Sequence, residues 1–400
     1  MKFVDFGLDS KVLDGIKAIG FEEATPVQEK AIPVILANRD IIASAQTGTG
    51  KTAAFLLPII HQIINGDHDE SIKALIIVPT RELAVQIDQQ MEGLSYFTSV
   101  SSLAVYGGGD GSSFSREKMA LSEGADIIIG TPGRLIAHLN MGYVKVNKLK
   151  HLILDEADRM LDMGFNEDLM KIVSYLPKKR QNLLFSATMP PKMRELARNI
   201  LHEPEEINIA VSKPAERIVQ AAFVVYDRQK IELAKYILSA KKLQSVIVFC
   251  STKSATKQLN RELKKMKFLS EEIHSDLEQK EREQVLQAFK NKKLNILVAT
   301  DILSRGIDIE DIELVINYDV PNDGEDYIHR IGRTARAASK GAAFTFVNEK
   351  EQRNFLEIEE LLGAPVPKAK LPASLGETPV YNPRKRNGSS GKKRFVKKAR

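Results

Sequence analysis

Cysteine and tryptophan are almost missing from this sequence: among 400 residues there is one cysteine, Cys250, and no tryptophan. A single cysteine permits no internal disulfide, so a reducing compartment, the cytoplasm, is expected. Long hydrophobic runs are missing too, since stretches such as 245–250 are far shorter than the ~18 residues that cross a bilayer. The first seven residues include an acid and a glycine, where a signal peptide needs an unbroken apolar stretch. We therefore expect neither a membrane protein nor a secreted one.

Acidic residues are nearly absent from the C-terminal end. Residues 368–400 hold eleven lysines and arginines but one acid, Glu377, which gives +10 and leaves −4 for residues 1–367. Five prolines between 365 and 383 and a Gly-Ser-Ser-Gly stretch predict a disordered, flexible basic tail over 364–400. Such a tail favours a polyanion partner through counterion release, and a merely solubilising end is the alternative.

The rest of the chain contains short, fully apolar runs separated by helix-length amphipathic stretches. They form two series, at 41–45, 74–78, 102–106, 126–129, 151–154 and 182–185, and then at 221–226, 245–250, 295–299, 313–318 and 342–347. Continuous apolar strands that alternate with helices are typical of parallel sheets covered on both faces. We predict two α/β domains, at 1–212 and 218–363, joined by a linker at 213–217 near a short strand-like stretch at 207–210.

A glycine-rich loop follows the first apolar run and precedes a helical stretch. Its glycines let backbone N–H groups turn around phosphate oxygens, and the helix N-terminus adds its dipole. Lys51 is expected to neutralise the β- and γ-phosphates and Thr52 to offer its hydroxyl to Mg²⁺, although Ala45 stands where the strict pattern has glycine. The sequence predicts a nucleoside-triphosphate site built from Ser44, Ala45, Gln46, Thr47, Gly48, Thr49, Gly50, Lys51 and Thr52.

Two acids follow the apolar run at 151–154, where ligands gather in α/β sheets. We expect Asp155 to hold Mg²⁺ through water and Glu156 to polarise the attacking water. Buried strand-end carboxylates are costly unless a cation or a donor satisfies them, so a plain solvated turn fits poorly.

The residues upstream of the loop indicate the base. A guanine-reading Asn-Lys-x-Asp sequence is absent. The Gln28 amide suits the paired donor and acceptor of adenine, and Phe21 is placed to stack on the base. An alternative for Gln28 is a helix start, with Thr25 and Pro26 as the preceding residues.

These features together resemble the DEAD-box RNA helicase family, which is named for the letters Asp155-Glu156-Ala157-Asp158. The resemblance covers about residues 3–350, and its short N-terminus and basic C-terminus look most like the bacterial RhlE-type branch. The matching motifs, in chain order, are Phe3, Gly20–Gln28, Ala45–Thr52, Pro79–Ala84, Gly107–Gly108, Thr131–Arg134, the acidic box, Ser186–Thr188, Val248–Thr252, Gln279 with Arg282, Ala299–Asp301, Arg305–Asp308 and His329–Arg333.

The resemblance implies two tandem RecA-like domains, ATP and Mg²⁺ as cofactors, and RNA-stimulated ATP hydrolysis. The second half of the chain has no phosphate loop, so a single nucleotide is expected to be sandwiched between the domains. Arg333 and Arg336 would stabilise the γ-phosphate in the transition state, and Asp308 would touch the ribose. The residues that would couple hydrolysis to RNA are Asp158, Ser186, Thr188 and His329.

The resemblance also implies RNA contacts, which would reach phosphates and 2′-hydroxyls without reading the base sequence. The residues implied are Arg81, Gly108, Thr131, Arg134, Arg282 and Thr300. The chain departs from the family pattern at Ala335, Ser275 and 302–304, which bears on fine RNA contacts. We expect an ATP-dependent RNA helicase that opens short duplexes locally. An ATP-gated RNA clamp and a DNA helicase are the alternatives.

Overall fold

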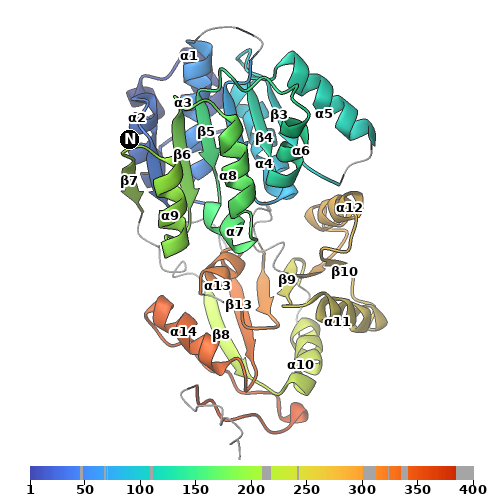
Figure 1. Ribbon diagram of the computed structural model, residues 1–400. Coiled ribbons are helices and arrows are strands. Elements are labelled where there is room, and N and C mark those ends of the chain that lie inside the picture. The colour runs from blue at the N-terminus through green and yellow to red at the C-terminus, as the bar shows by residue number, and fades with distance from the viewer. Residues whose placement is uncertain are drawn as a thin grey trace, which may run out of the picture. The chain divides into compact units, whose positions relative to one another are not determined.

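The computed structural model describes residues 1–45, 48–66, 69, 71–108, 111–209, 218–240, 243–300, 312–322, 324–334 and 341–383, apart from the side chains of 111, 112 and 325. The chain divides into two compact units, chiefly Met1–Lys213 and chiefly the residues from Pro214 onward. The predicted linker at 213–217 lies outside the described residues, and each unit is described by itself (Figure 1).

The first unit is a seven-stranded, wholly parallel sheet with helices on both faces. Its strands lie in the order β3-β4-β2-β5-β6-β1-β7. They are β1 (Ile41–Ser44), β2 (Ala74–Ile77), β3 (Ser102–Val105), β4 (Ile127–Gly130), β5 (His151–Leu154), β6 (Gln181–Ser186) and β7 (Glu205–Asn208). The predicted short strand at 207–210 is therefore β7, begun two residues earlier, which pairs with β1 at the edge of the sheet.

Alternate side chains of the strands point to opposite faces, and each face has its own core. On one face Ile76 and Ile153 join a core with the helices α1 (Ser10–Ala18), α2 (Pro26–Leu36), α3 (Lys51–Ile64) and α4 (Arg81–Ser95). On the other face Leu75 and Leu152 pack against α5 (Gly111–Glu123), α6 (Pro132–Asn140), α7 (Ala157–Asp162), α8 (Asn166–Tyr175) and α9 (Pro191–Ile200). A short 3-10 helix, η1 (Phe3–Phe6), precedes α1.

The second unit is built on a six-stranded parallel sheet in the order β10-β11-β9-β12-β13-β8. Its strands are β8 (Val219–Val224), β9 (Val246–Phe249), β10 (Ser270–Ile273), β11 (Ile296–Ala299), β12 (Leu314–Asn317) and β13 (Ala342–Val347). Its helices are α10 (Asp227–Ser239), α11 (Lys253–Lys265), α12 (Gln279–Lys290), α13 (Gly324–Ile331) and α14 (Gln352–Leu362), with a 3-10 turn, η3, at Ala373–Leu375. The expectation of two RecA-like α/β domains with parallel sheets is confirmed.

The segment at 364–383 corrects the prediction of a tail that is flexible from residue 364 onward. Lys368 forms a parallel bridge with Ala222, so the segment continues the sheet beyond edge strand β8. The buried Glu359 carboxylate accepts hydrogen bonds from the Lys368 ammonium and from the Tyr381 hydroxyl. Sequence composition could not indicate these contacts because their partners lie on β8 and α14, which are distant in the chain. Residues 384–400, with most of the basic charge, lie outside the described residues.

Candidate nucleotide and RNA site

The carboxyl edge of the first sheet carries nearly all the predicted site residues of this unit, in two groups. The loops after the neighbouring strands β5, β6 and β1 hold the predicted nucleotide residues. The loops after β3, β4 and β2 hold the predicted RNA residues. Ligands in open parallel sheets bind outside the carboxyl ends of the strands, and one edge groups the residues of the two predicted sites.

The phosphate loop adopts the backbone that its glycines require. Gly48 and Gly50 have positive φ angles of 78° and 91°, and Lys51 begins α3 directly afterwards. A Cβ at Gly50 would lie 2.5 Å from Gln28 Nε2. The buried Lys51 ammonium donates to the Ala45 carbonyl at 2.7 Å. Thr52 follows in the first turn of α3, and Gln46 and Thr47 lie outside the described residues.

Gln28 is a helix-start residue in this structure and also a contact of the phosphate loop. Its Oε1 accepts from the Thr25 backbone N–H at 2.9 Å, which closes the N-terminus of α2. Its Nε2 donates to the Gly50 carbonyl at 3.1 Å. Phe21 stacks on Phe3 with ring centroids 6.3 Å apart. The adenine contacts of Gln28 and Phe21 remain predictions, and the structure adds a direct link between Gln28 and the phosphate loop.

The acidic box follows β5 in a strained backbone. Glu156 has φ 50° and ψ 46°, a left-handed conformation that is uncommon for a residue other than glycine and that clusters at functional sites. Burial raises the pKa of Asp155 to about 6 despite the positive charge of Lys51. The buried Glu156 Oε2 accepts no hydrogen bond within the described part of the chain. Glu156 Oε2 lies 3.5 Å from Arg159 Nη1, and Lys51 lowers the pKa of Asp155, yet burial still raises that pKa above its ordinary value. A buried carboxylate in this state is one that a further cation would satisfy.

Mg²⁺ fits this donor set. Among the described residues no cluster of three or more His, Cys, Asp or Glu side chains forms a metal cage. Mg²⁺ rarely needs one, because it keeps several waters and binds through one or two carboxylates together with substrate phosphates. Asp155 and the Thr52 hydroxyl are the protein groups that would hold it.

Asp158 ties the acidic box to the loop after β6. Its Oδ2 accepts three hydrogen bonds at 3.1 Å, from the backbone N–H groups of Ala187 and Thr188 and from the Thr188 hydroxyl. The Ser186 hydroxyl donates to the Thr188 carbonyl at 2.6 Å. The structure thus brings together the three coupling residues that the sequence placed in this unit.

The RNA group is also assembled locally. A Cβ at Gly108, which has φ 89°, would collide with the Arg81 guanidinium, so this glycine admits the arginine. Thr131 precedes α6 as its N-cap residue, and Arg134 lies in the first turn of that helix. The Arg134 Nε donates to Glu117 Oε2 at 2.6 Å. Glu117 and its neighbours were missed at the sequence level, where no motif marks them.

The remaining predicted residues lie after residue 213, and Arg282 among them falls in the stretch Ser275–Gln284, which belongs to the first compact unit. Arg282 lies in the first turn of α12, and Thr300 follows β11 with its backbone N–H bonded to Ile273 O at 3.1 Å. His329 is buried on α13, and Arg333 is half-buried two residues beyond that helix. Asp308 and Arg336 lie outside the described residues, as do Ala335 and 302–304.

The geometry thus defines a two-unit α/β protein with a phosphate loop, strand-end carboxylates and an arginine-bearing edge. In comparisons with known proteins, the family description "DEAD/DEAH box helicase" matches residues 25–196, and "Helicase conserved C-terminal domain" matches residues 229–338. The ATP-dependent RNA helicase CshA of Listeria monocytogenes is 44% identical over 360 residues, covering 90% of this chain and 68% of that protein. The ATP-dependent RNA helicase DbpA of Bacillus subtilis is 38% identical, with 93% and 77% covered.

Solved structures give the same result. Saccharomyces cerevisiae Dbp5 bound to RNA and ADP BeF3 matches with a TM-score of 0.82 and 31% identity, over 92% of this chain and 95% of that chain. The chain belongs to the DEAD-box ATP-dependent RNA helicase family.

Proposed function

We propose that this chain is an RNA-stimulated ATPase that unwinds short RNA duplexes locally. The carrying observation is the Asp155 carboxyl, which is buried, has a pKa raised to about 6 and interacts electrostatically with Lys51 of the phosphate loop. A carboxylate in that environment, next to a lysine that belongs to a phosphate-binding loop, is suited to a cation–triphosphate substrate.

Each residue has a role in this proposal. The backbone of 45–51 and the Lys51 ammonium bind the β- and γ-phosphates. Mg²⁺, when bound, supplies positive charge to the phosphate oxygens, and Asp155 and Thr52 hold it. Glu156 orients and polarises the attacking water. Arg333 and Arg336 of the second unit are proposed to stabilise the charge that grows on the γ-phosphate.

RNA binding favours hydrolysis through the loop residues that meet at Asp158. The RNA residues Arg81, Gly108, Thr131 and Arg134 follow the carboxyl ends of β2, β3 and β4, and of these strands β2 lies next to β5. We propose that they bind the RNA backbone, with Arg282 and Thr300 adding further contacts. Since RNA and ATP both stabilise the active arrangement, each increases the affinity for the other.

Three finer assignments are part of the proposal. The RhlE-type branch is one, although the relatives compared above carry the names CshA and DbpA. A cytoplasmic location is another, supported by the lone Cys250, which is buried and whose thiol pKa burial raises. None of the described helices is long and apolar enough to cross a membrane. The third is Mg²⁺ as the cation.

A strand-displacement assay with a short RNA duplex tests the proposal. ATP with Mg²⁺ should release the labelled strand, whereas a non-hydrolysable analogue should support binding without repeated release. RNA retained with negligible ATP turnover would instead identify a clamp, and equal ATPase stimulation by single-stranded DNA would identify a DNA helicase. Either result would contradict the proposed function.

A further inference from the structure

We propose that Glu117 is a positioning residue that fixes the Arg134 guanidinium for contact with RNA phosphates. This inference rests on the RNA-binding role proposed above for Arg134. Glu117 belongs to α5, which carries none of the predicted site residues, and it is 7% exposed. A buried carboxylate needs donors, and the two that Glu117 has within the described residues come from α6.

Two contacts restrict the Arg134 side chain, an ion pair at Nε and an aromatic ring against the face of the guanidinium. Its Nε donates to Glu117 Oε2 at 2.6 Å, in an ion pair whose side chains are 15% and 9% exposed. Its guanidinium lies over the Phe114 ring, 4.5 Å from the centroid. An arginine stem has several rotatable bonds, so fixing Nε and the guanidinium plane removes most of the freedom that RNA binding would otherwise have to restrict.

His138 in turn fixes the position of the Glu117 carboxylate. It lies one helical turn after Arg134 on α6, and its Nε2 is 2.7 Å from the same Glu117 Oε2. Its ring stacks on Phe114 with centroids 4.4 Å apart, and its Nδ1 contacts the Tyr143 hydroxyl. Although burial opposes ionisation of Glu117, hydrogen bonds from His138 and Arg134 hold the pKa of this carboxyl below its ordinary value.

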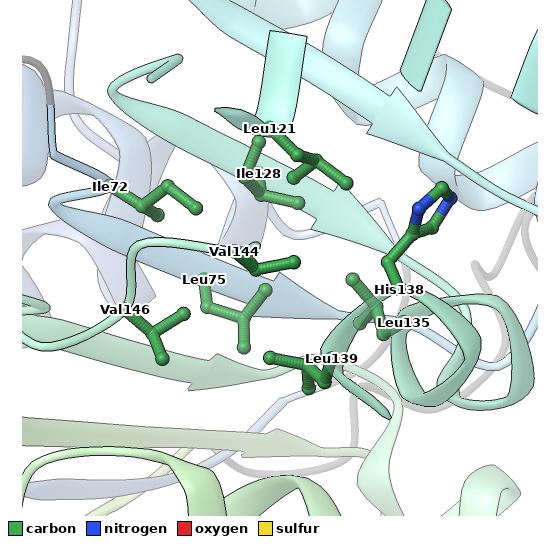
Figure 2. A pocket seen from close by; sticks show the side chains of 9 residues that line it. All are labelled: Ile72, Leu75, Leu121, Ile128, Leu135, His138, Leu139, Val144 and Val146. Carbon is green, nitrogen blue, oxygen red and sulfur yellow. The ribbon is translucent and has the colours of Figure 1, made fainter. Parts of the chain in front are cut away.

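The space around His138 excludes a ligand-binding explanation for this cluster. His138 lies at one end of a cavity whose other lining side chains are all aliphatic (Figure 2). This cavity has a volume of about 10 Å³, which is no more than a single water needs. The polar atoms of His138 meet Glu117 and Tyr143, so its role lies within the protein.

The remaining donors of Arg134 are those that an RNA phosphate would use. Glu117 takes Nε, and Nη2 is buried without a hydrogen-bond acceptor in the described part of the chain. A buried guanidinium donor without an acceptor destabilises the protein, and an acceptor that reaches it removes this cost. Guanidinium N–H groups pair well with phosphate oxygens, and Glu117 engages only the Nε of this guanidinium.

A double-mutant cycle on the full chain tests the proposal, with the RNA concentration that half-maximally stimulates ATPase as the measurement. We expect Glu117→Ala to raise this concentration about 10-fold, the scale of a lost charge-assisted hydrogen bond. Glu117→Gln, which retains an acceptor oxygen, should raise it only about 2- to 3-fold. In an Arg134→Ala background, Glu117→Ala should add nothing, because Glu117 acts through Arg134.

The matched control is Asp88→Ala, which removes another partly buried carboxylate of the first unit, one that accepts from the Ser102 hydroxyl at 2.6 Å. It should leave the half-saturating RNA concentration unchanged. If Arg134→Ala alone leaves that concentration unchanged, the proposed role of Arg134 fails. If Arg134→Ala raises it but Glu117→Ala does not, or if the two effects simply add, the positioning role of Glu117 is overturned.

Discussion

Asp155 shows how a single residue of the site opposes the stability of the fold. Its pKa is raised to about 6 from an ordinary 3.8, chiefly because burial removes solvent from the carboxylate. The ionised form therefore costs the folded state roughly 3 kcal/mol above pH 6, and that cost disappears as the pH falls toward 3.8. Functional sites often retain such unfavourable charges because the chemistry requires them.

We predict that Asp155→Asn stabilises the protein while it abolishes ATP hydrolysis. Without nucleotide or divalent cation, the free energy of unfolding in urea should rise by about 1–3 kcal/mol at pH 8. The loss of the attraction between Asp155 and Lys51 reduces this gain. The gain should shrink between pH 6 and pH 4, where Asp155 of the unaltered chain takes up a proton in the fold. Glu167→Gln, at an exposed acid of α8, serves as the control. A destabilised Asp155→Asn variant at pH 8 would contradict this account.

His151, the first residue of β5, gives the opposite pH dependence. Its Nδ1 lies 2.9 Å from Gln181 Oε1, and the Gln181 Nε2 donates to the Ile35 and Arg39 carbonyls. Since that amide is fixed, His151 must donate from Nδ1. Burial lowers the pKa of His151 to about 4, so the fold holds a neutral ring.

We predict that His151 makes the protein less stable as the pH falls from 6.5 to 4. The unfolded chain binds a proton there that the folded chain does not, which costs up to roughly 3 kcal/mol. His151→Gln should remove this part of the pH slope, whereas His202→Gln, at an exposed histidine, should leave it intact. Urea unfolding at several pH values measures the difference. Identical slopes for the unaltered chain and His151→Gln would show that the ring is not held neutral.

At the scale of elements, the strands with continuous apolar runs were predictable and the polar edge strand was not. The runs at 151–154 and 342–347 are β5 and β13 with the same bounds. Strand β10, Ser270–Ile273, was missed because two glutamates occupy its middle, as an edge strand with a half-exposed surface allows. The segment at 364–383 was misjudged for a related reason, since its prolines indicated flexibility while its long-range partners could not be read from the sequence.

We predict that two truncations separate the packed segment from the basic tail. Ending the chain at Gly363 removes the Lys368 and Tyr381 contacts of Glu359 and uncovers β8, so the second unit should lose several kcal/mol of stability. Ending it at Pro383 keeps those contacts and removes nine lysines and arginines.

The truncation at Pro383 should keep the stability of the full chain but bind RNA more weakly, with a shallower dependence on salt. Urea unfolding and RNA-binding titrations over a range of salt concentrations measure the two effects. Equal stability of both truncations would show that residues 364–383 do not support the second unit. An unchanged salt slope for the chain that ends at Pro383 would show that the tail does not contact the phosphate backbone.

At the scale of the whole molecule, the motifs of both sites were evident in the sequence, but their arrangement was not. Lys51, Asp155 and Ser186 are far apart in the chain, and they become neighbours because β1, β5 and β6 are adjacent in the sheet. Arg81, Gly108 and Arg134 are grouped in the same way by β2, β3 and β4. Strand order depends on crossover connections and packing, which local patterns do not specify. Glu117 escaped sequence reasoning because its function depends on this packing.

The central claim is that the protein hydrolyses ATP at the carboxyl edge of its first sheet, with Glu156 activating water and RNA stimulating the reaction. Its most direct test is steady-state phosphate release with and without RNA, for the unaltered chain and for Glu156→Gln, together with ATP-dependent RNA binding. We predict RNA-stimulated release by the unaltered chain, and loss of release with retained ATP-dependent RNA binding in Glu156→Gln. Undiminished RNA-stimulated release by Glu156→Gln would contradict the account.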